Sequence, residues 1–338
     1  MDESNSPPPI KIIREPFLIR NPWFSIVMVM VFYFLFQLIP LLVYSFLVPT
    51  TFAIDHPYVI RIIEFVSLGI LLLIFIPFLR IPKDNRNYRQ YLKDIQLLTV
   101  TIKGVLVGLL TTMVLFILAY GSVYLSAVLS KLYYVEIKGY IILESPGVVM
   151  DPSYLFDPNA GLNVYYALTP GIMEELAFRG VILVLLLKKY SWKKAIIVDG
   201  ILFGCFHLLN LLGPTIDFIS GPNAGDIYLY IALIRSVGFQ VIYATSLGIA
   251  WAFMFIKSKS LIPSILAHWL IDAFGGLVLI PNIGLESFAI SWIYFICITL
   301  LGIGVLPAIL DVLIIKGSYR GPTINPWEDW SKRDLYQV

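Results

Sequence analysis

The stretch GIMEELAFRG, residues 171–180, places two adjacent glutamates and an arginine inside an apolar part of the chain. It is preceded by NVYYALTP and followed by VILVLLL, so the whole segment resembles a membrane helix. A charged side chain at the centre of a bilayer costs roughly 2.5–3.5 kcal/mol on insertion scales. Three such residues within six positions therefore require a structural or functional reason.

The composition of the whole chain is typical of a membrane protein. Of its 338 residues, 59% are hydrophobic and 14% are charged, whereas soluble domains are about 45–50% apolar and about 25% charged. The net charge of +2 indicates neither an acidic nor a basic partner, and no nucleic-acid-binding motif is present. Cys205 and Cys297 both lie in apolar stretches, so no disulfide framework or zinc knuckle is predicted.

Apolar runs of about 20 residues predict eight membrane-spanning helices. Their approximate bounds are 23–49, 58–79, 98–130, 161–187, 195–212, 227–256, 261–282 and 287–315. Most lysines and arginines fall in the two tails and in the loops after the second, fourth and sixth spans, whereas the opposite side carries Lys131, Lys138 and Arg61. This asymmetry predicts that both termini are cytoplasmic. We therefore expect an all-α fold, a polytopic helix bundle.

The chain is predicted to form one bundle flanked by two tails. Residues 1–22 are polar and Pro-rich, which predicts a disordered cytoplasmic tail. Residues 23–315 are predicted to form the bundle, and residues 316–338 are predicted to form a second cytoplasmic tail. No cleaved signal peptide is expected, because no apolar region directly follows the charged start. The longest outer connection, 131–160, is rich in turn signals and can cap the bundle on the outside.

The charged residues of the opening stretch do not all have the same explanation. Glu175 and Arg179 are spaced i, i+4, so they lie on one helix face and are expected to form a structural ion pair. Glu174 points about 100° away around the helix and has no partner in the local sequence. An intramembrane carboxylate without a partner is a hypothesis of function by default.

The histidines strengthen this hypothesis. The chain has three: His56 lies in a predicted outer loop, whereas His207 and His268 lie on the fifth and seventh predicted spans. At about 1.5 Å per residue, Glu174, His207 and His268 lie roughly 21, 20 and 14 Å from the cytoplasmic helix ends. We therefore expect these three side chains to converge on one layer. Asp272 follows His268 by one turn on the same face.

A glutamate and two histidines in a desolvated cavity support hydrolysis. The carboxylate can take a proton from water, and a histidine oriented by a carboxylate can stabilise an oxyanion. The set Glu174, His207 and His268 could equally hold zinc, although the chain lacks the H-E-x-x-H motif of zinc proteases. No motif surrounds Ser264, which disfavours a serine triad. Asp199, two turns below His207, is expected at most to line an access path.

Three short motifs occur in order on three separate predicted spans. They are E-E-x-x-x-R, F-x-x-x-H and H-x-x-x-D, formed by Glu174, Glu175 and Arg179, by Phe203 and His207, and by His268 and Asp272. They resemble the three motifs of the CPBP family, also called ABI, which groups type II CAAX prenyl endopeptidases with bacteriocin-processing and self-immunity proteins. The resemblance covers residues 174–272, and eight spans agree with the architecture of the endopeptidases.

The resemblance implies a role for each motif residue. Glu174 would be the base that activates water, with His207 beside it, and Glu175 and Arg179 would form the supporting pair. Phe203 belongs to the second motif.

His268 and Asp272 would match the pair that binds the oxyanion. The CAAX endopeptidases have asparagine at the last position, and an aspartate repels an oxyanion unless it is protonated or bonded to the histidine. We therefore expect Asp272 to orient His268. This departure bears directly on whether the chain cleaves CAAX substrates.

These observations favour an intramembrane endopeptidase with a catalytic core at about 161–282. We expect a glutamate mechanism without a cofactor, with a zinc metalloprotease as the alternative. The expected partners are the lipid bilayer and a peptide or prenylated protein, from which the enzyme would remove the C-terminal tripeptide of a CAAX sequence. The expected location is the cell membrane of a prokaryote or the endoplasmic reticulum membrane of a eukaryote.

Two other classes of function remain open at this stage. One is a self-immunity or scaffold protein that keeps the fold without proteolysis; the presence of every motif residue argues against it. The other is a proton-coupled transporter, because buried glutamate and histidine chains also relay protons. The chain shows none of the paired, glycine-broken segments typical of transporters with inverted repeats.

Overall fold

The computed structural model describes residues 16–47, 58–83, 87–98, 149–150, 160–221, 224–274 and 278–279, together with parts of 100–117. The predicted span 287–315 lies outside the described residues, as do most of 98–130, most of the loop 131–160 and the tail 316–338. Residues 1–15 of the predicted N-terminal tail, His56 and Cys297 also lie outside them.

The described elements are helical apart from one two-residue strand pairing, which confirms the predicted all-α class. The first half contains α1 (Phe17–Arg20), α2 (Pro22–Leu47), α4 (Tyr58–Ile70), the π-helix η2 (Leu71–Phe75), α5 (Ile76–Phe78), α6 (Tyr88–Asp94) and β1 (Val149–Met150). The second half contains α8 (Ala160–Glu175), the π-helix η4 (Leu176–Ile182), α9 (Leu183–Lys189), α10 (Trp192–Phe206), the 3₁₀ helix η5 (His207–Leu211), α11 (Leu212–Ser220), α12 (Ile227–Ser258), α13 (Ile262–Phe274) and β2 (Val278–Leu279).

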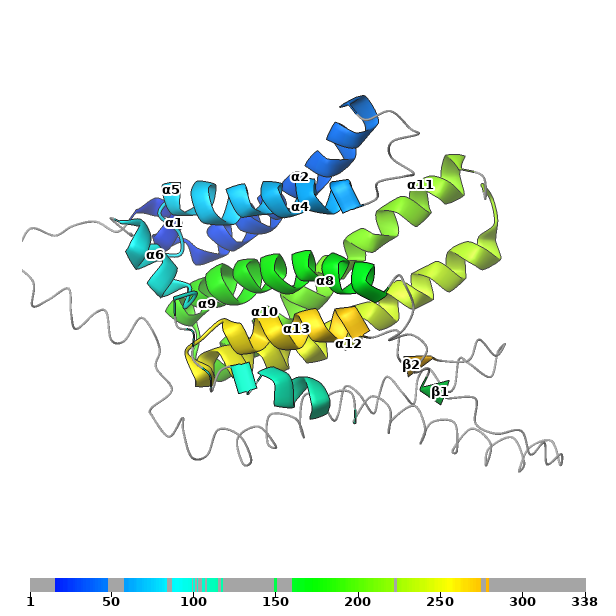
Figure 1. Ribbon diagram of the computed structural model, residues 1–338. Helices are drawn as coiled ribbons and strands as arrows, with labels where there is room; N and C mark the ends of the chain where they lie inside the picture. The colour runs from blue at the N-terminus through cyan, green and yellow to red at the C-terminus, as the bar shows by residue number, and fades with distance from the viewer. Residues whose placement is uncertain are drawn as a thin grey trace, which may run out of the picture.

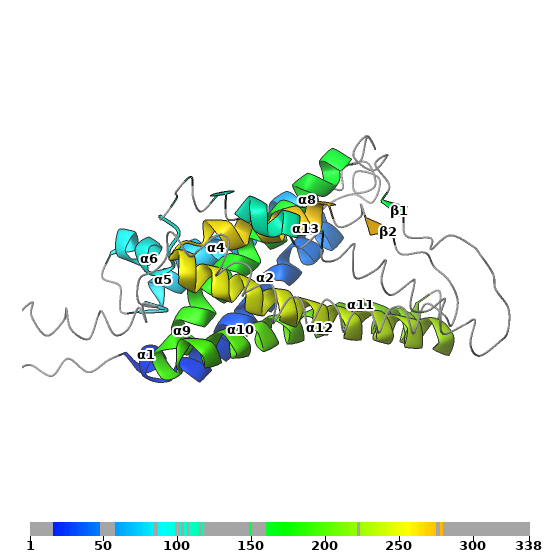
Figure 2. The same ribbon diagram turned by 90° about the horizontal axis from the view of Figure 1, so that it is seen from below.

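The helices pack side by side as a bundle. Figure 1 shows α2 and α4 together on one side, the continuous run α8–η4–α9 in the middle, and α12 and α13 on the other side. Within this bundle α10 packs along α12, and α8 packs along α13. The hairpin of α11 and α12 extends beyond the other helices, as Figure 2 shows.

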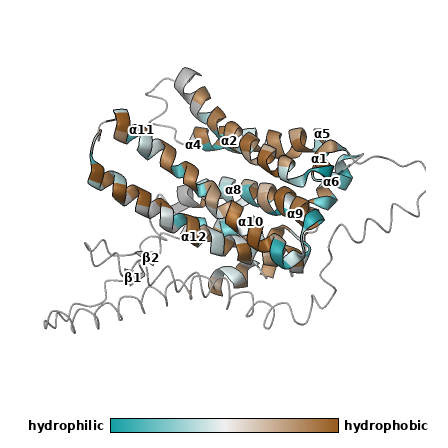
Figure 3. Cartoon of the chain, turned by 180° about the vertical axis from the view of Figure 1, so that it is seen from behind, coloured by the Kyte–Doolittle hydropathy of each residue, from teal (hydrophilic) through white to brown (hydrophobic). Residues whose placement is uncertain are grey.

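The outer surface of the bundle is apolar. Three runs are long and apolar enough to cross a membrane: Pro22–Pro40, Val59–Phe78 and Trp192–Ser220. Large hydrophobic side chains such as Val31, Val66 and Ile74 are about half exposed, and Figure 3 shows hydrophobic residues along the outer helices. Soluble proteins rarely expose apolar surface on this scale, so the chain is an integral membrane protein. The count of eight spans and the cytoplasmic termini stay predictions.

Two predicted spans have different bounds in the structure. The fifth, predicted at 195–212, belongs to a helical run from Trp192 to Ser220. The run continues because Pro214 lies in the first turn of α11, where a helix tolerates proline. The seventh, predicted at 261–282, is too long, since α13 ends at Phe274 and residues 278–279 form β2.

The early end of α13 is explained by its sequence. Gly275 and Gly276 follow the helix directly, and glycine costs roughly 1 kcal/mol relative to alanine inside a helix. Beyond them, β2 pairs antiparallel with β1, with Val149 opposite Leu279 and Met150 opposite Val278. The end of the seventh predicted span is therefore joined to part of the outer loop 131–160.

Glycines allow the two closest helix pairs to form. A Cβ atom at Gly200 would lie 2.5 Å from the Ile249 side chain, and one at Gly204 would overlap Thr245, so α10 and α12 approach through their backbones. A Cβ atom at Gly171 would lie 2.8 Å from the backbone of Trp269. Small residues have this role at helix interfaces in membranes. The contact at Gly171 brings α13, and with it His268, against the glutamates of α8.

Candidate active site

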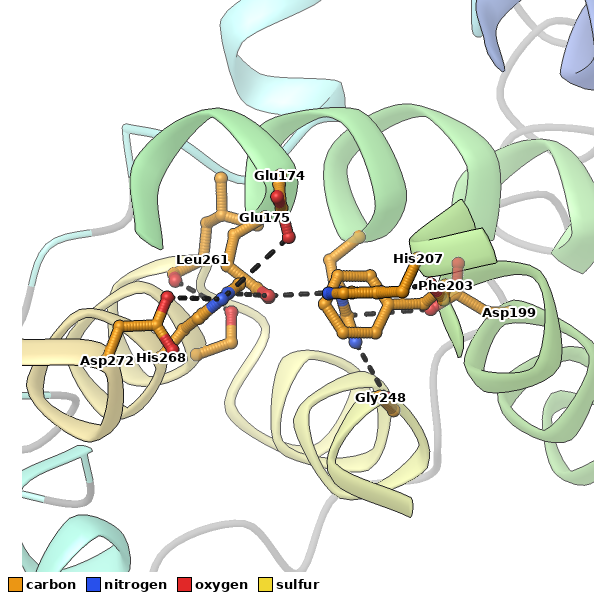
Figure 4. Close-up of polar contacts among 11 residues, drawn as sticks. Glu174, Glu175, Asp199, Phe203, His207, Gly248, Leu261, His268 and Asp272 are labelled. Carbon is orange, nitrogen blue, oxygen red and sulfur yellow. Dashed lines mark hydrogen bonds and ion pairs between the residues drawn. The ribbon is translucent and has the colours of Figure 1, made fainter. Parts of the chain in front are cut away.

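Arg179 lies at the centre of the polar cluster. Its side chain is fully buried, and its guanidinium contacts a carboxylate on each side: Nη1 lies 3.0 Å from Glu175 Oε1 and Nε lies 3.5 Å from Asp199 Oδ2. The Glu175 contact is the i, i+4 pair predicted from the sequence. Nη2 donates a hydrogen bond to the Gly248 carbonyl oxygen at 3.0 Å, and Figure 4 labels the three partners Glu175, Asp199 and Gly248.

Aromatic rings pack against the guanidinium of Arg179. Arg179 Cζ lies 4.5 Å from the centre of the Phe203 ring and 5.4 Å from the Trp251 ring. A cation over an aromatic face is stabilised most when both groups are removed from water. The arginine is therefore held by two carboxylates, one carbonyl and two rings, which fits the supporting role that the motif implies.

His268 bridges the second set of carboxylates. Its Nδ1 lies 2.9 Å from Glu175 Oε1, and its Nε2 lies 3.3 Å from Asp272 Oδ2 and 3.9 Å from Glu174 Oε2. Because both ring nitrogens face carboxylate oxygens, both can donate only when the ring is an imidazolium. The Trp251 ring stacks on His268 with centroids 4.2 Å apart, so the orientation of this imidazole is fixed on three sides.

Glu174 has a different environment from the adjacent Glu175. Glu175 is fully buried and its Oε1 contacts both Arg179 and His268. The Glu174 side chain is 12% exposed, and its Oε2 has no hydrogen-bond partner within the described residues. Its closest cationic group is His268 Nε2 at 3.9 Å. The two neighbouring carboxylates each keep a buried Oε2 without a hydrogen-bond partner among the described residues, but they differ in that Glu175 is held in close ion pairs and Glu174 is not.

His207 lies at the edge of this cluster. Its Nδ1 is 3.0 Å from the Phe203 carbonyl oxygen, which can only accept, so Nδ1 carries the proton and Nε2, which has no hydrogen-bond partner within the described residues, can accept. Its ring packs edge-on against Phe203, with centroids 5.1 Å apart, and His268 packs on the same ring at 5.8 Å. Both histidines therefore pack against the Phe203 ring, and His207 joins the cluster through this ring.

Local helix geometry at the site departs from the regular α-helix assumed in the sequence analysis. The π-helix η4 begins directly after Glu175 and contains Arg179, and the 3₁₀ helix η5 begins at His207. Interruptions of this kind are frequent at functional sites. Two of the three motifs therefore coincide with a change of helix type.

The described residues do not form a metal site. Within the part of the chain that the structure describes, no group of three or more His, Cys, Asp or Glu side chains could hold a metal ion. The zinc alternative, with Glu174, His207 and His268 as ligands, stays a prediction. The Ser264 hydroxyl donates to the Leu261 carbonyl oxygen at 3.0 Å, so it is engaged with its own helix.

Sequence reasoning missed two residues of the cluster. Asp199 was expected to line an access path, but it is fully buried and paired with Arg179. Its position one residue before Gly200, where α10 meets α12, is the only signal that could have placed it in the interior. Trp251 was not singled out, because a tryptophan in an apolar span carries no local sign of contact with a histidine.

These features define a membrane-embedded helical protein with a buried cluster of carboxylates, one arginine and two histidines. Residues 158–274 match a family described as type II CAAX prenyl endopeptidase Rce1-like. The match confirms the resemblance that the motifs predicted. It covers α8 to α13 and every motif residue, and at the level of the family it implies a membrane endopeptidase. Searches of curated proteins and of solved structures gave no match.

Proposed function

We propose that this protein is an intramembrane endopeptidase in which Glu174 activates a water molecule for attack on a peptide bond. The observation that carries this proposal is the contrast between the two adjacent glutamates. Glu175 is fully buried and its Oε1 is engaged by Arg179 and His268 at 3.0 and 2.9 Å, whereas Glu174 is 12% exposed and lies 3.9 Å from His268 Nε2. A general base needs a carboxylate that is not already held in a close ion pair.

The proposed chemistry assigns a step to each of two side chains. Glu174 takes one proton from the water, whose oxygen bonds to the carbonyl carbon of the substrate. The resulting tetrahedral intermediate collapses when the C–N bond breaks, and Glu174 returns the proton to the leaving amine. The free Nε2 of His207 accepts a hydrogen bond from the water and orients it.

His268 has an electrostatic role in this proposal. As an imidazolium between Glu175 and Asp272 it places a fixed positive charge beside Glu174. A preorganised charge in a water-poor site stabilises negative charge that develops in the transition state. The proposal assigns no step to a metal ion.

The proposed substrate class comes from the family match. Residues 158–274 match endopeptidases of prenylated CAAX sequences, so we propose that the substrate is a prenylated C-terminal peptide from which three residues are removed. Asp272 stands where the CAAX endopeptidases have asparagine, and the test must therefore compare prenylated with unprenylated peptides.

The experiment measures cleavage of a fluorogenic farnesyl-CAAX peptide by the purified full-length protein in detergent, with the unprenylated peptide in parallel. Glu174→Gln removes the base without changing its size, and cleavage should fall by about 10²–10⁴-fold. Glu64→Gln is the matched control, since Glu64 is another carboxylate within a span but is paired with Arg61 at 2.6 Å. Its activity should stay within about twofold of the wild type, an effect below about 0.5 kcal/mol.

Each outcome has a clear meaning. Cleavage that is lost in Glu174→Gln and retained with a chelator supports the glutamate mechanism. If the chelator abolishes cleavage and added zinc restores it, the glutamate mechanism is wrong and a metal mechanism is supported. Equal cleavage of both peptides overturns the proposal that the substrate is prenylated. If the wild type cleaves neither peptide, the proposed CAAX activity is overturned.

A further inference from the structure

The short helix α1 and the start of α2 are joined to the turn between α9 and α10 by two hydrogen bonds. Lys188 Nζ donates to the Ile19 carbonyl oxygen at 3.0 Å, and Trp23 Nε1 donates to the Tyr190 hydroxyl oxygen at 2.9 Å. Figure 2 shows α1 beside α9 at this end of the bundle. Two segments that are more than 160 residues apart in the chain therefore form one continuous surface.

Two ammonium groups of this surface share one aromatic ring. Lys194 Nζ lies 4.7 Å and Lys189 Nζ lies 5.9 Å from the centre of the Tyr190 ring. Both distances are within the range of a cation–π contact, and both lysine side chains are exposed. The contact with Trp23 fixes the Tyr190 hydroxyl, so the ring that gathers the two cations is held against α2.

Two further exposed cations complete the surface. Lys193 Nζ lies 5.7 Å from the centre of the Trp192 ring, and Arg20 follows directly after Ile19 on α1 and is exposed. None of the four cations forms an ion pair with a carboxylate of the residues that the structure describes. We call this surface the basic patch, defined by Arg20, Trp23, Lys189, Tyr190, Lys193 and Lys194. Its positive charge attracts an anion.

Exposed aromatic rings next to the basic patch indicate which class of anion it fits. The Phe17 and Phe24 side chains are 55% and 54% exposed, and Trp23 is 37% exposed. The Phe17 and Phe24 rings pack edge-on with centroids 5.5 Å apart. A soluble anionic partner would leave these rings in water, whereas a phospholipid covers the rings with its acyl chains and places its headgroup at the cations. Tryptophan and tyrosine are also enriched at the level of the headgroups.

We propose that the basic patch binds the headgroup of an anionic phospholipid. Clusters of four or more lysines and arginines beside a membrane helix are typical of such binding. The lipid would contact α1 and the turn between α9 and α10 together, and so hold the N-terminal helices against the run α8–η4–α9. This proposal does not rest on the proposed endopeptidase activity, and its test needs no substrate.

The test compares lipid binding by two double variants of the full-length protein. Native mass spectrometry in detergent, with added dioleoylphosphatidylglycerol or dioleoylphosphatidylcholine, gives the Kd of the first bound lipid. We expect the wild type to bind the anionic lipid more tightly, and Lys189→Gln/Lys194→Gln to weaken that binding by about 30-fold. Arg89→Gln/Lys93→Gln is the matched control, because it removes two exposed cations of α6 and should change the Kd by less than about threefold.

A second variant separates charge from structure. Lys189→Arg/Lys194→Arg keeps both charges and should bind the anionic lipid like the wild type. Without lipid, all three variants should unfold near the wild-type temperature, since substitutions of exposed side chains have small effects on stability.

Three results would overturn the proposal. The first is equal binding of the two lipids by the wild type. The second is equal weakening in Lys189→Gln/Lys194→Gln and Arg89→Gln/Lys93→Gln, because the attraction would then come from the total charge and not from the basic patch. The third is displacement of dioleoylphosphatidylglycerol by inorganic phosphate at the same concentration, which would show that the patch binds a free anion.

Discussion

Two clusters of buried charge in this molecule are built in opposite ways. At one end of the bundle, the loop cluster of Lys83, Gln90, Tyr91 and Asp94 engages its polar groups with one another: Gln90 Nε2 donates to Asp94 Oδ1 at 2.9 Å, Lys83 Nζ lies 4.0 Å from the same oxygen, and Tyr91 donates to the Leu72 carbonyl. The active-site cluster instead gathers the carboxylates of Glu174, Glu175, Asp199 and Asp272 around Arg179 and His268. The loop cluster therefore sets one cation against one carboxylate, whereas the active-site cluster holds more carboxylates than cations.

Arg179→Met should have the largest effect, since it breaks the cluster at its centre. The substitution leaves Glu175 and Asp199 buried without their shared cation, and the loss of one partner of a buried ion pair costs about 3–5 kcal/mol. We expect a large fall in the unfolding temperature in detergent and loss of cleavage. Arg61→Met is the control, because Arg61 pairs with one carboxylate rather than two and its side chain is 43% exposed, so its removal should lower the unfolding temperature less. Equal stability of the two variants would contradict this.

Lys83→Met should destabilise the protein without changing catalysis. The Lys83 and Asp94 side chains are each 2% exposed and lie 4.0 Å apart as an ion pair, and leaving a buried polar group without its partner costs about 1–3 kcal/mol. Thermal unfolding and kcat measured on the same preparation test the comparison directly. A fall in kcat at constant folded fraction would show that the loop cluster also serves the active site.

Asp199→Asn should have a smaller effect on both properties. Asparagine keeps the shape and one oxygen but removes the charge opposite Arg179 Nε. If Asp199 positions the arginine, kcat should fall by about tenfold, equivalent to about 1.4 kcal/mol, and KM should stay near its wild-type value. Asp199→Glu restores the charge with a longer side chain, and partial recovery of kcat in that variant would distinguish positioning from packing.

Asp272→Asn should have the smallest effect on stability, because the Asp272 side chain is 37% exposed. The new amide can donate to the oxyanion while its oxygen still accepts from His268 Nε2. We therefore expect cleavage of the farnesyl-CAAX peptide to rise by about three- to tenfold, equivalent to roughly 0.7–1.4 kcal/mol. Steady-state kinetics of both peptides measures this, and a loss of activity would indicate that the charge of Asp272 is required.

The parts of this site that the sequence predicts are those that depend on local geometry. The Glu175–Arg179 pair follows from i, i+4 spacing on one helix, and the approach of His268 to Glu174 follows from the depth of each residue in its span. Helix class and the approximate positions of the spans follow from runs of apolar residues, because a bilayer requires about 20 of them.

The remaining features depend on contacts between distant segments. Asp199 meets Arg179 because Gly200 and Gly248 let α10 and α12 pack closely. A Cβ atom added at Gly248 would lie only 3.0 Å from the Cα atom of Gly200. Trp251 stands among many other aromatic residues in apolar runs, where no spacing rule indicates which ring stacks on His268. The ends of the fifth and seventh spans depend on Pro214 and on the glycine pair after Phe274.

The order of the Arg179 contacts along the chain bears on biogenesis. Chains are made from the N-terminus at about 5–20 residues per second. The guanidinium of Arg179 is made within a turn of Glu175, and Asp199 follows soon after, whereas His268 lies 93 residues beyond Glu175. Both carboxylate partners of Arg179 are therefore available early in membrane insertion. The helix that carries Glu174 can be inserted with its arginine already paired, before His268 is synthesised.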